Sequence, residues 1–507
     1  MIGAETTILL TLLVPLIGSG LILLTGASPN LRETVILITA SLLFLLVASL
    51  LPSVYDGARP AVTFIEMVPG LSIAFKVEPL GMTFACIASF LWIVTTVYSI
   101  GYMRGHHEEN QTRFYFYFAI SLMAAIGVAF AANMMTLFIF YEVLTLCTFP
   151  LVAHHGTEES KRAGRVYLGI LIGTSLAFQL LAIAWTWVAA GTLDFTKGGI
   201  LADKVSETVA GVLLALYVFG IGKAAVMPFH RWLPAAMVAP TPVSALLHAV
   251  AVVKAGVFTV VKVITYIFGI DFLSDIPQTQ ILSWVAAFTM LTASIIALGK
   301  DNLKARLAYS TVSQLSYIVL GATLATGLGI VASGMHIAMH AFGKITLFFC
   351  AGAILVAAHK TEISQMDGLG RTMPYTYTAF LIGSLCVIGL PPMGGAWSKF
   401  YLITAAADAG QIILVLAYMA STLLAIGYLL PVVVRGFLKP VPVTTNRDHA
   451  DLSASDHKHD DIAAEDMGIR EAPLSCLLAM AVSSAGCLLL FFFADSLFEM
   501  LGGIFRN

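Results

Sequence analysis

Charged residues are scarce in this chain: Asp, Glu, Lys and Arg make up 11% of its 507 residues, whereas 59% are hydrophobic. The mean hydropathy is +0.90. This balance excludes a soluble globular domain, in which about a quarter of the residues are charged. Apolar runs of roughly twenty residues recur along the chain, long enough to cross about 30 Å of hydrocarbon. The alternating segments of a membrane β-barrel are absent, so we predict an all-α membrane protein, because a helix satisfies its own backbone polar groups in lipid.

Signatures of bound cofactors are also missing. The six cysteines lie in apolar runs and form no CxxC pair, which indicates small core residues rather than metal ligands or disulfides. No glycine-rich nucleotide fingerprint occurs. We therefore expect no cofactor and no metal, and the net charge of −2 gives no reason to expect a nucleic-acid partner. The first apolar run lacks a basic leading segment and a clear cleavage site, so we expect a retained helix rather than a signal peptide.

The apolar runs predict fourteen transmembrane helices. Their approximate bounds are residues 6–26, 33–52, 79–103, 114–131, 134–153, 165–188, 207–227, 241–268, 280–299, 303–323, 327–357, 374–403, 411–436 and 472–503. Between the second and third spans, residues 61–77 alternate apolar and other residues around Pro69 and Gly70. That pattern predicts a small hairpin on one membrane face.

The basic residues predict the orientation of the chain. Most of the 27 lysines and arginines lie in loops that follow odd-numbered spans, and such loops face the cytoplasm by the positive-inside rule. We therefore predict a bacterial inner-membrane protein with both termini on the outer, periplasmic side. The polar loop 444–470, rich in Asp and His, is expected to be a solvated cytoplasmic segment; a weak divalent-metal site there is the alternative.

Charge is concentrated in the stretch 220–262, which lies between apolar helices. It contains Lys223, Lys254 and Lys262. It also contains helix-breaking prolines, namely Pro228, Pro234, Pro240 and Pro242. One ionisable residue in an apolar helix costs roughly 2.5–3.5 kcal/mol on insertion scales. A region that accepts this cost several times is expected to move charge.

Glu142 is the one acidic residue well inside a predicted span. A carboxylate at that depth is expected to have a cation opposite it, and Lys223 of span seven is the natural candidate. A static ion pair that holds two helices together is the alternative. We favour a functional pair because further titratable residues lie in series in the same bundle, which a structural pair would not need.

Span eight contains two lysines. Lys254 lies near its middle, and burial would allow it to exchange protons near neutral pH. His248 lies six residues earlier, so the two share a face only if a turn is unwound. Lys262 lies nearer the outer end and can reach the lipid headgroups as an alternative to an internal role.

Span eleven contains His336, His340 and Lys344 at positions i, i+4 and i+8. This spacing stacks them on one helix face, and histidine titrates near neutrality, so we predict a proton relay. The alternatives are a two-histidine metal site, which lacks a third ligand nearby, and packing histidines satisfied by hydroxyl groups.

Lys399 lies in span twelve within IGLPPMGGAWSKF. Prolines and glycines interrupt the helix there, as they do after Lys223 in span seven. Paired broken helices in corresponding parts of two halves indicate an ion path at the membrane middle. Lys304, at the start of span ten, is expected to be a cytoplasmic-edge lysine and a candidate pathway entrance.

Four long motifs carry a family resemblance. They are GKAAVMPFHRWLPAAMVAPTPVSALLHAVAVVKAG, DNLKARLAYSTVSQLSYIVLG, GMHIAMHAFGKITLFFCAGAI and GLPPMGGAWSKF. They resemble the antiporter-like subunits shared by Mrp-type multisubunit Na⁺/H⁺ antiporters, respiratory complex I and membrane-bound hydrogenases. The resemblance implies fourteen helices, inverted repeats formed by spans 4–8 and 9–13, and broken helices seven and twelve.

The resemblance also implies a division of the chain. Its parts are an N-terminal three-helix region with a small hairpin (1–113), a first five-helix repeat (114–268), a second five-helix repeat (280–436), a polar cytoplasmic loop (437–471) and a C-terminal helix (472–507). Glu142 and Lys223 resemble the family's span-five and span-seven pair. Lys254 resembles its central lysine, with His248 beside it, and Lys399 resembles the last residue of its row.

Among the family, the chain is most similar to the D-type subunits of Mrp antiporters. Lys399 stands where one complex I subunit has glutamate, and the largest complex I subunit continues into a long lateral helix beyond span fourteen. We expect a subunit that moves protons, with Na⁺ as a further candidate ion, in a complex with other membrane subunits. The alternative is a proton-pumping subunit of a redox complex, either complex I-like or a membrane-bound hydrogenase. A scaffold with purely structural charges is a third reading.

Overall fold

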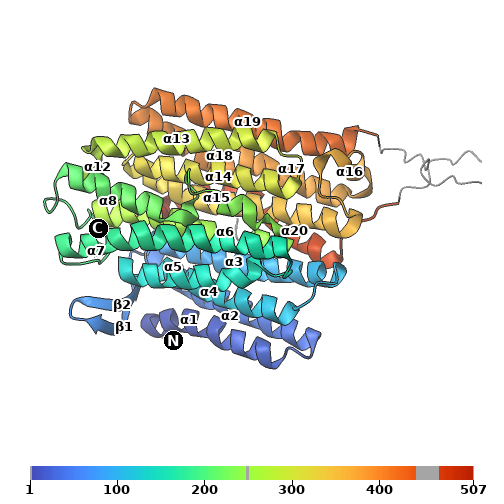
Figure 1. Cartoon of the computed structure of the whole chain (residues 1–507), viewed down its shortest axis with the longest axis horizontal. Helices are drawn as coiled ribbons and strands as arrows, with labels where there is room; N and C mark the ends of the chain where they lie inside the picture. Colours follow the sequence, from blue (N-terminus) through green and yellow to red (C-terminus); the bar gives the residue numbers. More distant parts are fainter. Residues whose placement is uncertain (1–2, 247–250, 441–467, 506–507) are drawn as a thin grey trace, which may run out of the picture.

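The computed structural model describes residues 3–246, 251–440 and 468–505, in which long helices lie side by side in one bundle (Figure 1). Within these residues, ten helices are long and apolar enough to cross a membrane by length and composition. Both observations agree with the predicted all-α membrane protein. His248 and most of the polar loop 444–470 lie outside the described residues.

The first half of the chain contains the elements from α1 to α10. They are α1 (Ala4–Leu24), α2 (Pro29–Tyr55), β1 (Ala61–Val68), β2 (Leu71–Lys76), α3 (Pro79–Gly105), α4 (Gln111–Phe130), α5 (Met134–Val152), α6 (Glu158–Thr174), η1 (Ser175–Gln179), α7 (Leu180–Ala190), α8 (Glu207–Gly220), η2 (Gly222–Ala224), α9 (Trp232–Ala235), η3 (Ala236–Val238) and α10 (Thr241–Ala245).

The second half contains the remaining elements. They are α11 (Val252–Lys262), η5 (Val263–Phe268), α12 (Ile270–Ser274), α13 (Pro277–Leu298), α14 (Leu303–Thr323), α15 (Gly327–Ala358), η6 (Ile363–Gln365), α16 (Leu369–Thr372), α17 (Pro374–Ile388), α18 (Gly395–Asp408), α19 (Ile412–Leu438), α20 (Leu474–Phe492) and α21 (Ala494–Gly502).

Each predicted span coincides with one or more of these helices, and helices seven and twelve are broken as predicted. Span seven ends early, at the close of α8, and span twelve is divided into α17 and α18. Gly389 ends α17 in the left-handed region, with φ of +89°, a conformation that glycine adopts without steric strain. The exact count of fourteen crossings and the division into inverted repeats remain predictions: the helices of the broken spans are short, and α14, although 21 residues long, is not among the ten helices that qualify by length and composition.

Two spans differ from the predicted regular helices. Span six is longer than expected, and a π-helical turn, η1, interrupts it. In span eight a π-helical turn, η5, follows α11, and residues 247–250, between α10 and α11, lie outside the described part of the chain.

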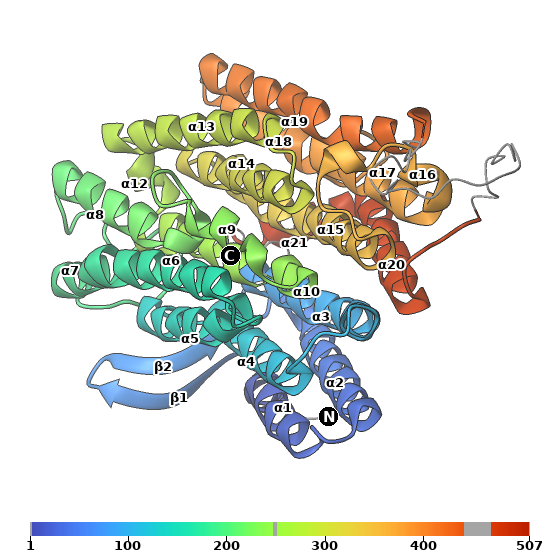
Figure 2. The ribbon, with the colours of Figure 1, turned by 45° about the vertical axis from the view of Figure 1, so that its right-hand side comes forward.

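The predicted hairpin is confirmed. β1 and β2 pair antiparallel around a turn at Pro69 and Gly70, and they project from one edge of the bundle beside α4 and α5 (Figures 1 and 2). Gly70 has a φ of +81°, which a tight turn of this kind requires.

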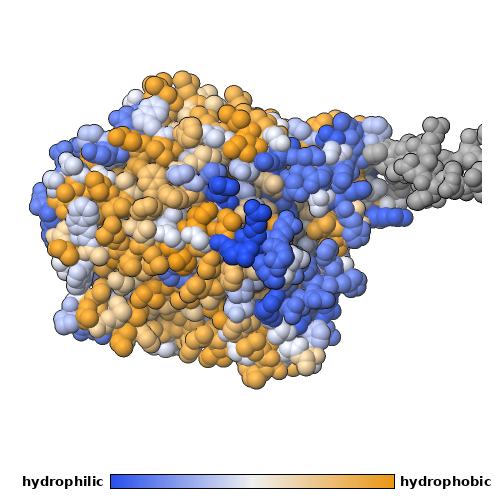
Figure 3. All heavy atoms as spheres, in the orientation of Figure 1, coloured by the Kyte–Doolittle hydropathy of each residue, from blue (hydrophilic) through white to orange (hydrophobic). Residues whose placement is uncertain are grey.

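The core lies along α3, α14 and α15. α15 is 32 residues long, and 78% of its most apolar window is buried, against 39% for α1 at the periphery. Its position inside the bundle also buries His336, His340 and Lys344. Hydrophobic residues cover most of the visible face, and hydrophilic ones lie along its left edge and over its right-hand part, from which they reach the centre (Figure 3); a large apolar surface is expected for a protein embedded in lipid.

Candidate functional site

Lys223 lies in the turn η2, where the helix of span seven ends. Gly220, the last residue of α8, is needed there because a Cβ would lie 2.4 Å from the backbone nitrogen of Gln179. The side chain of Lys223 is fully buried. The helix break therefore places a lysine inside the bundle, on backbone that neighbouring helices hold closely.

The Lys223 ammonium contacts α5. Its Nζ donates to the Tyr141 carbonyl at 2.8 Å and to the Thr145 hydroxyl at 2.5 Å. It also lies 3.1 Å from the centre of the Tyr141 ring, a cation–π contact that is strongest when water is excluded. These three contacts come from residues one turn apart on the same helix.

Glu142 is adjacent to these contacts but does not close the predicted ion pair. Within the described residues, no nitrogen–oxygen contact of 4.0 Å or less joins Glu142 to Lys223, although the Glu142 charge acts electrostatically on the lysine. Both carboxylate oxygens of Glu142 are buried without a hydrogen bond to any described residue. The Lys223 ammonium donates its hydrogen bonds to Tyr141 and Thr145 instead.

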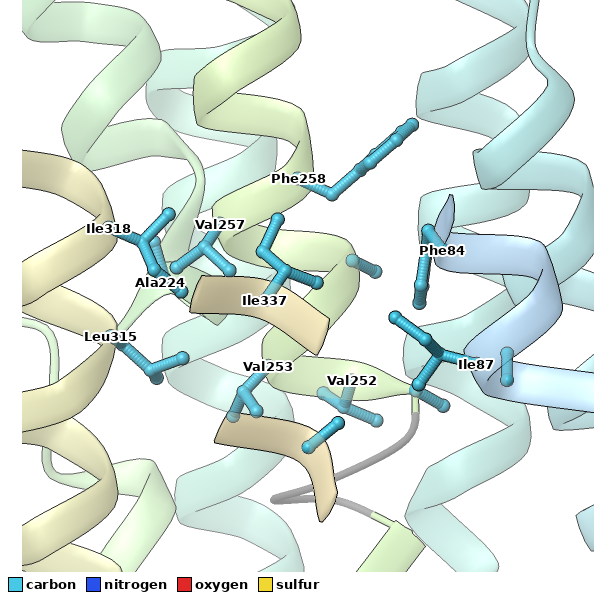
Figure 4. Packing of buried hydrophobic residues seen from close by; sticks show 14 of the residues in the cluster. Phe84, Ile87, Ala224, Val252, Val253, Val257, Phe258, Leu315, Ile318 and Ile337 are labelled. Carbon is cyan, nitrogen blue, oxygen red and sulfur yellow. The ribbon is translucent and has the colours of Figure 1, made fainter. Parts of the chain in front are cut away.

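α11 packs directly against the turn that holds Lys223. A Cβ at Gly256 would lie 2.3 Å from the carbonyl carbon of Lys223, so the close approach depends on glycine. Apolar side chains of α3, α11, α14 and α15, together with Ala224 of η2, surround the contact between α11 and η2 (Figure 4). Such packing excludes water and strengthens every charge interaction inside it.

Lys254 meets the histidines of α15. Its Nζ lies 2.5 Å from His340 Nδ1, and Lys254 is fully buried. The His340 ring stacks on that of His336, with centroids 5.8 Å apart and planes inclined by 20°. Residues predicted from two separate spans are therefore brought together in one buried row.

The row continues from His336 towards α18. His336 Nδ1 lies 2.9 Å from the Ser398 hydroxyl, and Nε2 lies 3.2 Å from Gln314 Oε1. The Tyr317 ring stacks on His336, with centroids 5.6 Å apart, and its centre lies 4.4 Å from Lys399 Nζ. Tyr317 thus links the histidine pair to the last lysine of the predicted path.

Lys344 is directed towards α14. Its Nζ donates to the Ser310 hydroxyl at 2.6 Å and to the Leu307 carbonyl at 3.2 Å. Ser310 in turn donates to the Tyr428 hydroxyl at 3.0 Å. Lys344 therefore begins a separate polar branch between α14, α15 and α19, which differs from the single helix-face stripe that the i, i+4, i+8 spacing predicted.

Lys399 lies at the edge of an open pocket. The side chain is 3% exposed, and its Nζ donates to the Thr422 hydroxyl at 3.4 Å. The pocket, of about 490 Å³, is lined by Ile388, Gly389, Pro391, Ala396, Trp397, Lys399, Phe400, Ile403, Thr422 and Phe491. The helix break of span twelve thus opens space next to a buried lysine.

The two remaining lysines have defined partners. Lys304 Nζ donates to the Ala239 carbonyl at 2.6 Å, which ties α14 to the turn before α10. Lys262 does not extend to the headgroups: it is fully buried, 3.3 Å from Glu78 Oε2 and 2.8 Å from the Ala131 carbonyl. Glu78, at the N-cap of α3, satisfies the ammonium internally, so the headgroup alternative is wrong.

No group of three or more His, Cys, Asp or Glu side chains in the described part of the chain is arranged to hold a metal ion. His336 directs both ring nitrogens at protein partners, and His340 directs Nδ1 at Lys254. The two-histidine metal alternative has no geometric support at these rings.

Sequence reasoning missed the neutral residues that connect the charged ones. They are Tyr141, Thr145, Ser310, Gln314, Tyr317, Ser398 and Thr422. Three of them recur along α14 at intervals of four and three residues. Polar positions with that helical spacing in a buried span could have been recognised as a second polar face.

Two family models match the chain. Residues 131–425 match the model described as NADH:quinone oxidoreductase/Mrp antiporter, TM. Residues 68–115 match the model of the N-terminus of chain 5 of NADH-ubiquinone oxidoreductase, complex I. The first model alone covers more than half of the chain.

Curated relatives are oxidoreductase subunits. NAD(P)H-quinone oxidoreductase chain 5 of Picosynechococcus is 31% identical over 364 residues, which cover 68% of this chain and 53% of that protein. NADH-quinone oxidoreductase subunit N of Desulforudis audaxviator is 30% identical over 379 residues, 74% of each chain. The chain spans about half the length of the chain 5 relatives it matches.

Solved structures share the fold over the whole chain. A chain of the Mrp complex from a Dietzia species superposes with a TM-score of 0.84 at 23% identity, covering 99% of this chain and 97% of that one. A chain of an archaeal membrane-bound sulfane sulfur reductase gives 0.83 at 23% identity, covering 98% and 96%. Together with the family match across the central helices, these findings show that the chain belongs to the NADH:quinone oxidoreductase/Mrp antiporter family of membrane subunits.

Proposed function

We propose that this chain is a proton-translocating subunit of a multisubunit monovalent cation/proton antiporter, similar to the D-type subunits of the Mrp complexes. The observation that carries the proposal is the buried row Lys254, His340, His336 and Lys399, joined by direct contacts or through Tyr317. Proton transfer requires donor and acceptor within hydrogen-bond reach, about 2.6–3.2 Å or through one intermediary. The Lys254–His340 contact meets that requirement, and ring contacts bring His336, Tyr317 and Lys399 next to it without a hydrogen bond between them.

The proposed path begins at the membrane face that bears Lys304 and passes to Lys254; His248, which the sequence also assigns to the path, lies outside the described residues. It continues through His340 and His336 and leaves near Lys399, where the pocket next to α18 gives access. Lys344 forms a side branch of the same polar network. The direction of net movement follows the gradient across the membrane.

The Glu142–Lys223 pair is the proposed switch. Lys223 has two sets of partners within reach of a side-chain movement: Tyr141 and Thr145, which it contacts, and the unsatisfied carboxylate of Glu142. A two-state element of this kind shifts when a charge nearby changes. Moving a proton onto Lys254 would supply such a change.

We place the protein in a bacterial inner membrane, with both termini on the periplasmic side and the polar loop 437–471 in the cytoplasm. The positive-inside distribution of basic residues supports this orientation. Other membrane subunits are the proposed partners, and protons are the proposed cargo, with Na⁺ as a further candidate. Large apolar side chains on the outer faces of α2 and α19, such as Leu45 and Leu423, are 64% and 67% exposed and offer surfaces for lipid or neighbouring subunits.

A second candidate function is proton pumping in a redox complex. The names of the curated relatives favour it, because those proteins are quinone oxidoreductase subunits. Purification of the native complex separates the two candidates. Small membrane subunits alone support the antiporter, whereas co-purifying iron–sulfur, flavin or nickel subunits support the redox pump.

The test is cation/proton exchange in everted vesicles from cells that express the complete set of subunits. Glu142→Gln, Lys223→Ala and Lys254→Met should each abolish pH- and Na⁺-dependent exchange while the complex still assembles. Lys161→Ala is the matched control, because Lys161 is an exposed lysine paired only with Glu158 of its own helix. Full exchange in the three core variants would refute the proposal and support a scaffold.

A further inference from the structure

A pocket lined by histidines and glutamates lies at one end of the bundle, outside the row described above. It measures about 340 Å³ and lies between the α3–α4 and α5–α6 connections. Both connections are at the same end of the bundle (Figure 1), the end predicted to face the cytoplasm. The lining residues are His106, His107, Glu108, Glu109, Asn110, His154, His155 and Thr157.

Glu108 is the centre of this cluster. One carboxylate oxygen lies 3.2 Å from His106 Nδ1, and the other lies 3.5 Å from His155 Nδ1. The Glu108 side chain is 6% exposed, whereas the two histidine side chains are 33% and 34% exposed. Two solvent-accessible imidazoles therefore flank one sheltered carboxylate, from two different loops.

The cluster is connected to the start of the proposed path. The His106 ring stacks on Tyr102, with centroids 5.7 Å apart and planes inclined by 9°. Thr241, the first residue of α10, donates to the Tyr102 hydroxyl at 3.5 Å. Contacts thus run from the pocket to the beginning of the span that bears Lys254.

Lys304 supplies a second connection. It contacts the Ala239 carbonyl, two residues before α10, and the charge of Glu108 acts on it electrostatically. The candidate entrance predicted from the sequence therefore lies within the field of this carboxylate. Thr241, connected to the cluster through Tyr102, and Ala239, which Lys304 contacts, are two residues apart in the chain.

We propose that His106, Glu108 and His155 form a proton-collecting antenna that exchanges protons between bulk water and the Lys304–Lys254 entrance. This inference rests on the proposed proton pathway and specifies its mouth. Imidazole and carboxylate groups titrate in and just below the physiological range, so together they can take a proton from solvent, hold it on a shared hydrogen bond and release it inward.

Other charged groups around the antenna shape its field. Arg113 of α4 donates to the His154 carbonyl at 2.7 Å, and Lys304 faces the cluster from α14. Burial, reinforced by Arg113 and His155, lowers the pKa of His154 to about 4, so this ring is neutral at working pH. His107 and Glu109 complete the lining from the α3–α4 loop. The antenna therefore consists of His106, Glu108 and His155.

A proton collector matters when protons are rare. At a diffusional limit of about 10¹⁰ M⁻¹ s⁻¹, a single group meets a free proton roughly 100 times per second at pH 8. Enzymes commonly turn over about 1 to 10³ times per second. At a comparable transport rate, proton delivery from water becomes limiting above pH 8. Focusing by a charged cleft raises capture by about 10- to 10³-fold.

The experiment measures exchange by the intact complex in everted vesicles, in weakly and in strongly buffered medium, at pH 6.5 and pH 8. Glu108→Gln and the double variant His106→Gln/His155→Gln should lower the rate at pH 8 about tenfold in weak buffer. A concentrated mobile buffer such as imidazole should restore it, because the buffer then carries protons to Lys304. At pH 6.5 the variants should differ little from the parent.

The controls separate this proposal from the pathway itself. Lys161→Gln, on the same membrane face, should show no buffer-dependent defect. Glu142→Gln should lose exchange in every buffer. The antenna proposal would be overturned if concentrated buffer failed to restore exchange in the antenna variants. It would also be overturned if these variants exchanged at the parental rate in weak buffer at pH 8. If the parent complex exchanges no protons in any buffer, the proposed function falls instead.

Discussion

Alanine at Gly256 is expected to stop transport while the bundle remains folded. The added Cβ would lie 2.3 Å from the carbonyl carbon of Lys223 and 2.4 Å from the backbone nitrogen of Ala224. Ordinary van der Waals contact begins at 3.4 Å, so α11 and η2 must separate by about 1 Å. Both clashing atoms belong to the backbone, so no side-chain rotation relieves the contact.

That separation is large relative to the contacts of the Lys223 ammonium. Its hydrogen bond to the Tyr141 carbonyl is 2.8 Å long, and at about 3.8 Å it would no longer be a hydrogen bond. Misplacing a reacting group by 1 Å can lower a rate roughly 100-fold. Overpacking costs typically about 1–3 kcal/mol, offset in part by about 1 kcal/mol of helix propensity. We therefore expect about a 100-fold fall in exchange with a modest loss of thermal stability.

The assay is Na⁺-dependent proton exchange in vesicles, combined with thermal unfolding of the purified complex. Gly169→Ala is the matched control, because Gly169 is also a helix glycine but its added Cβ would meet no heavy atom within 4 Å. The control should keep both exchange and stability. Exchange by Gly256→Ala at the parental rate, or equal losses in both variants, would refute the reasoning that close packing positions Lys223.

Three further outcomes follow from the same contacts. Thr145→Val removes a hydroxyl that binds the Lys223 ammonium; a charged hydrogen bond is worth about 1.5–3 kcal/mol, so exchange should fall about tenfold or more, and Thr145→Ser should retain it. Lys262→Ala removes the buried one of the two lysines that pair with Glu78 and leaves the partly exposed Lys76 as its cation; the cost should be smaller than the about 3–5 kcal/mol of a fully unpaired buried charge, measured as a lower unfolding temperature that Lys262→Ala/Glu78→Ala partly restores. Burial lowers the pKa of His154 from 6.5 to about 4, so its contribution to stability should be complete above pH 6.5 and decline as the pH falls towards 4; His154→Asn should flatten that decline in melting curves.

Helix positions were predictable because hydropathy and helix breakers act locally. The hairpin at 61–77, the early end of α8 and the division of span twelve at Pro391 and Pro392 all follow from residues adjacent in sequence. Span six was predicted as a regular helix because its apolar residues continue through it. Apolar content reports burial, and it does not report where a π-helical turn such as η1 falls.

Partners across helices were harder to predict. His336 and His340 share a helix face, so their stacking follows from their spacing. Lys344 has the same spacing, yet its long side chain reaches Ser310 on α14. Lys262 likewise finds Glu78, which lies in the chain just before α3. Flexible side chains choose among acceptors on neighbouring helices, and only the packing of those helices decides which acceptor is near.

The charge pair predicted between Glu142 and Lys223 is open in the structure. Each of its oxygens is buried without a hydrogen bond from the described residues, and leaving a buried acceptor unsatisfied costs about 1–3 kcal/mol. Lys223 instead satisfies the Tyr141 carbonyl and the Thr145 hydroxyl. If the ammonium turned to Glu142, it would relieve one cost and create another of similar size, because those two acceptors would lose their donor. Two arrangements of comparable free energy are what a switch requires, whereas a static pair would have closed on the better one.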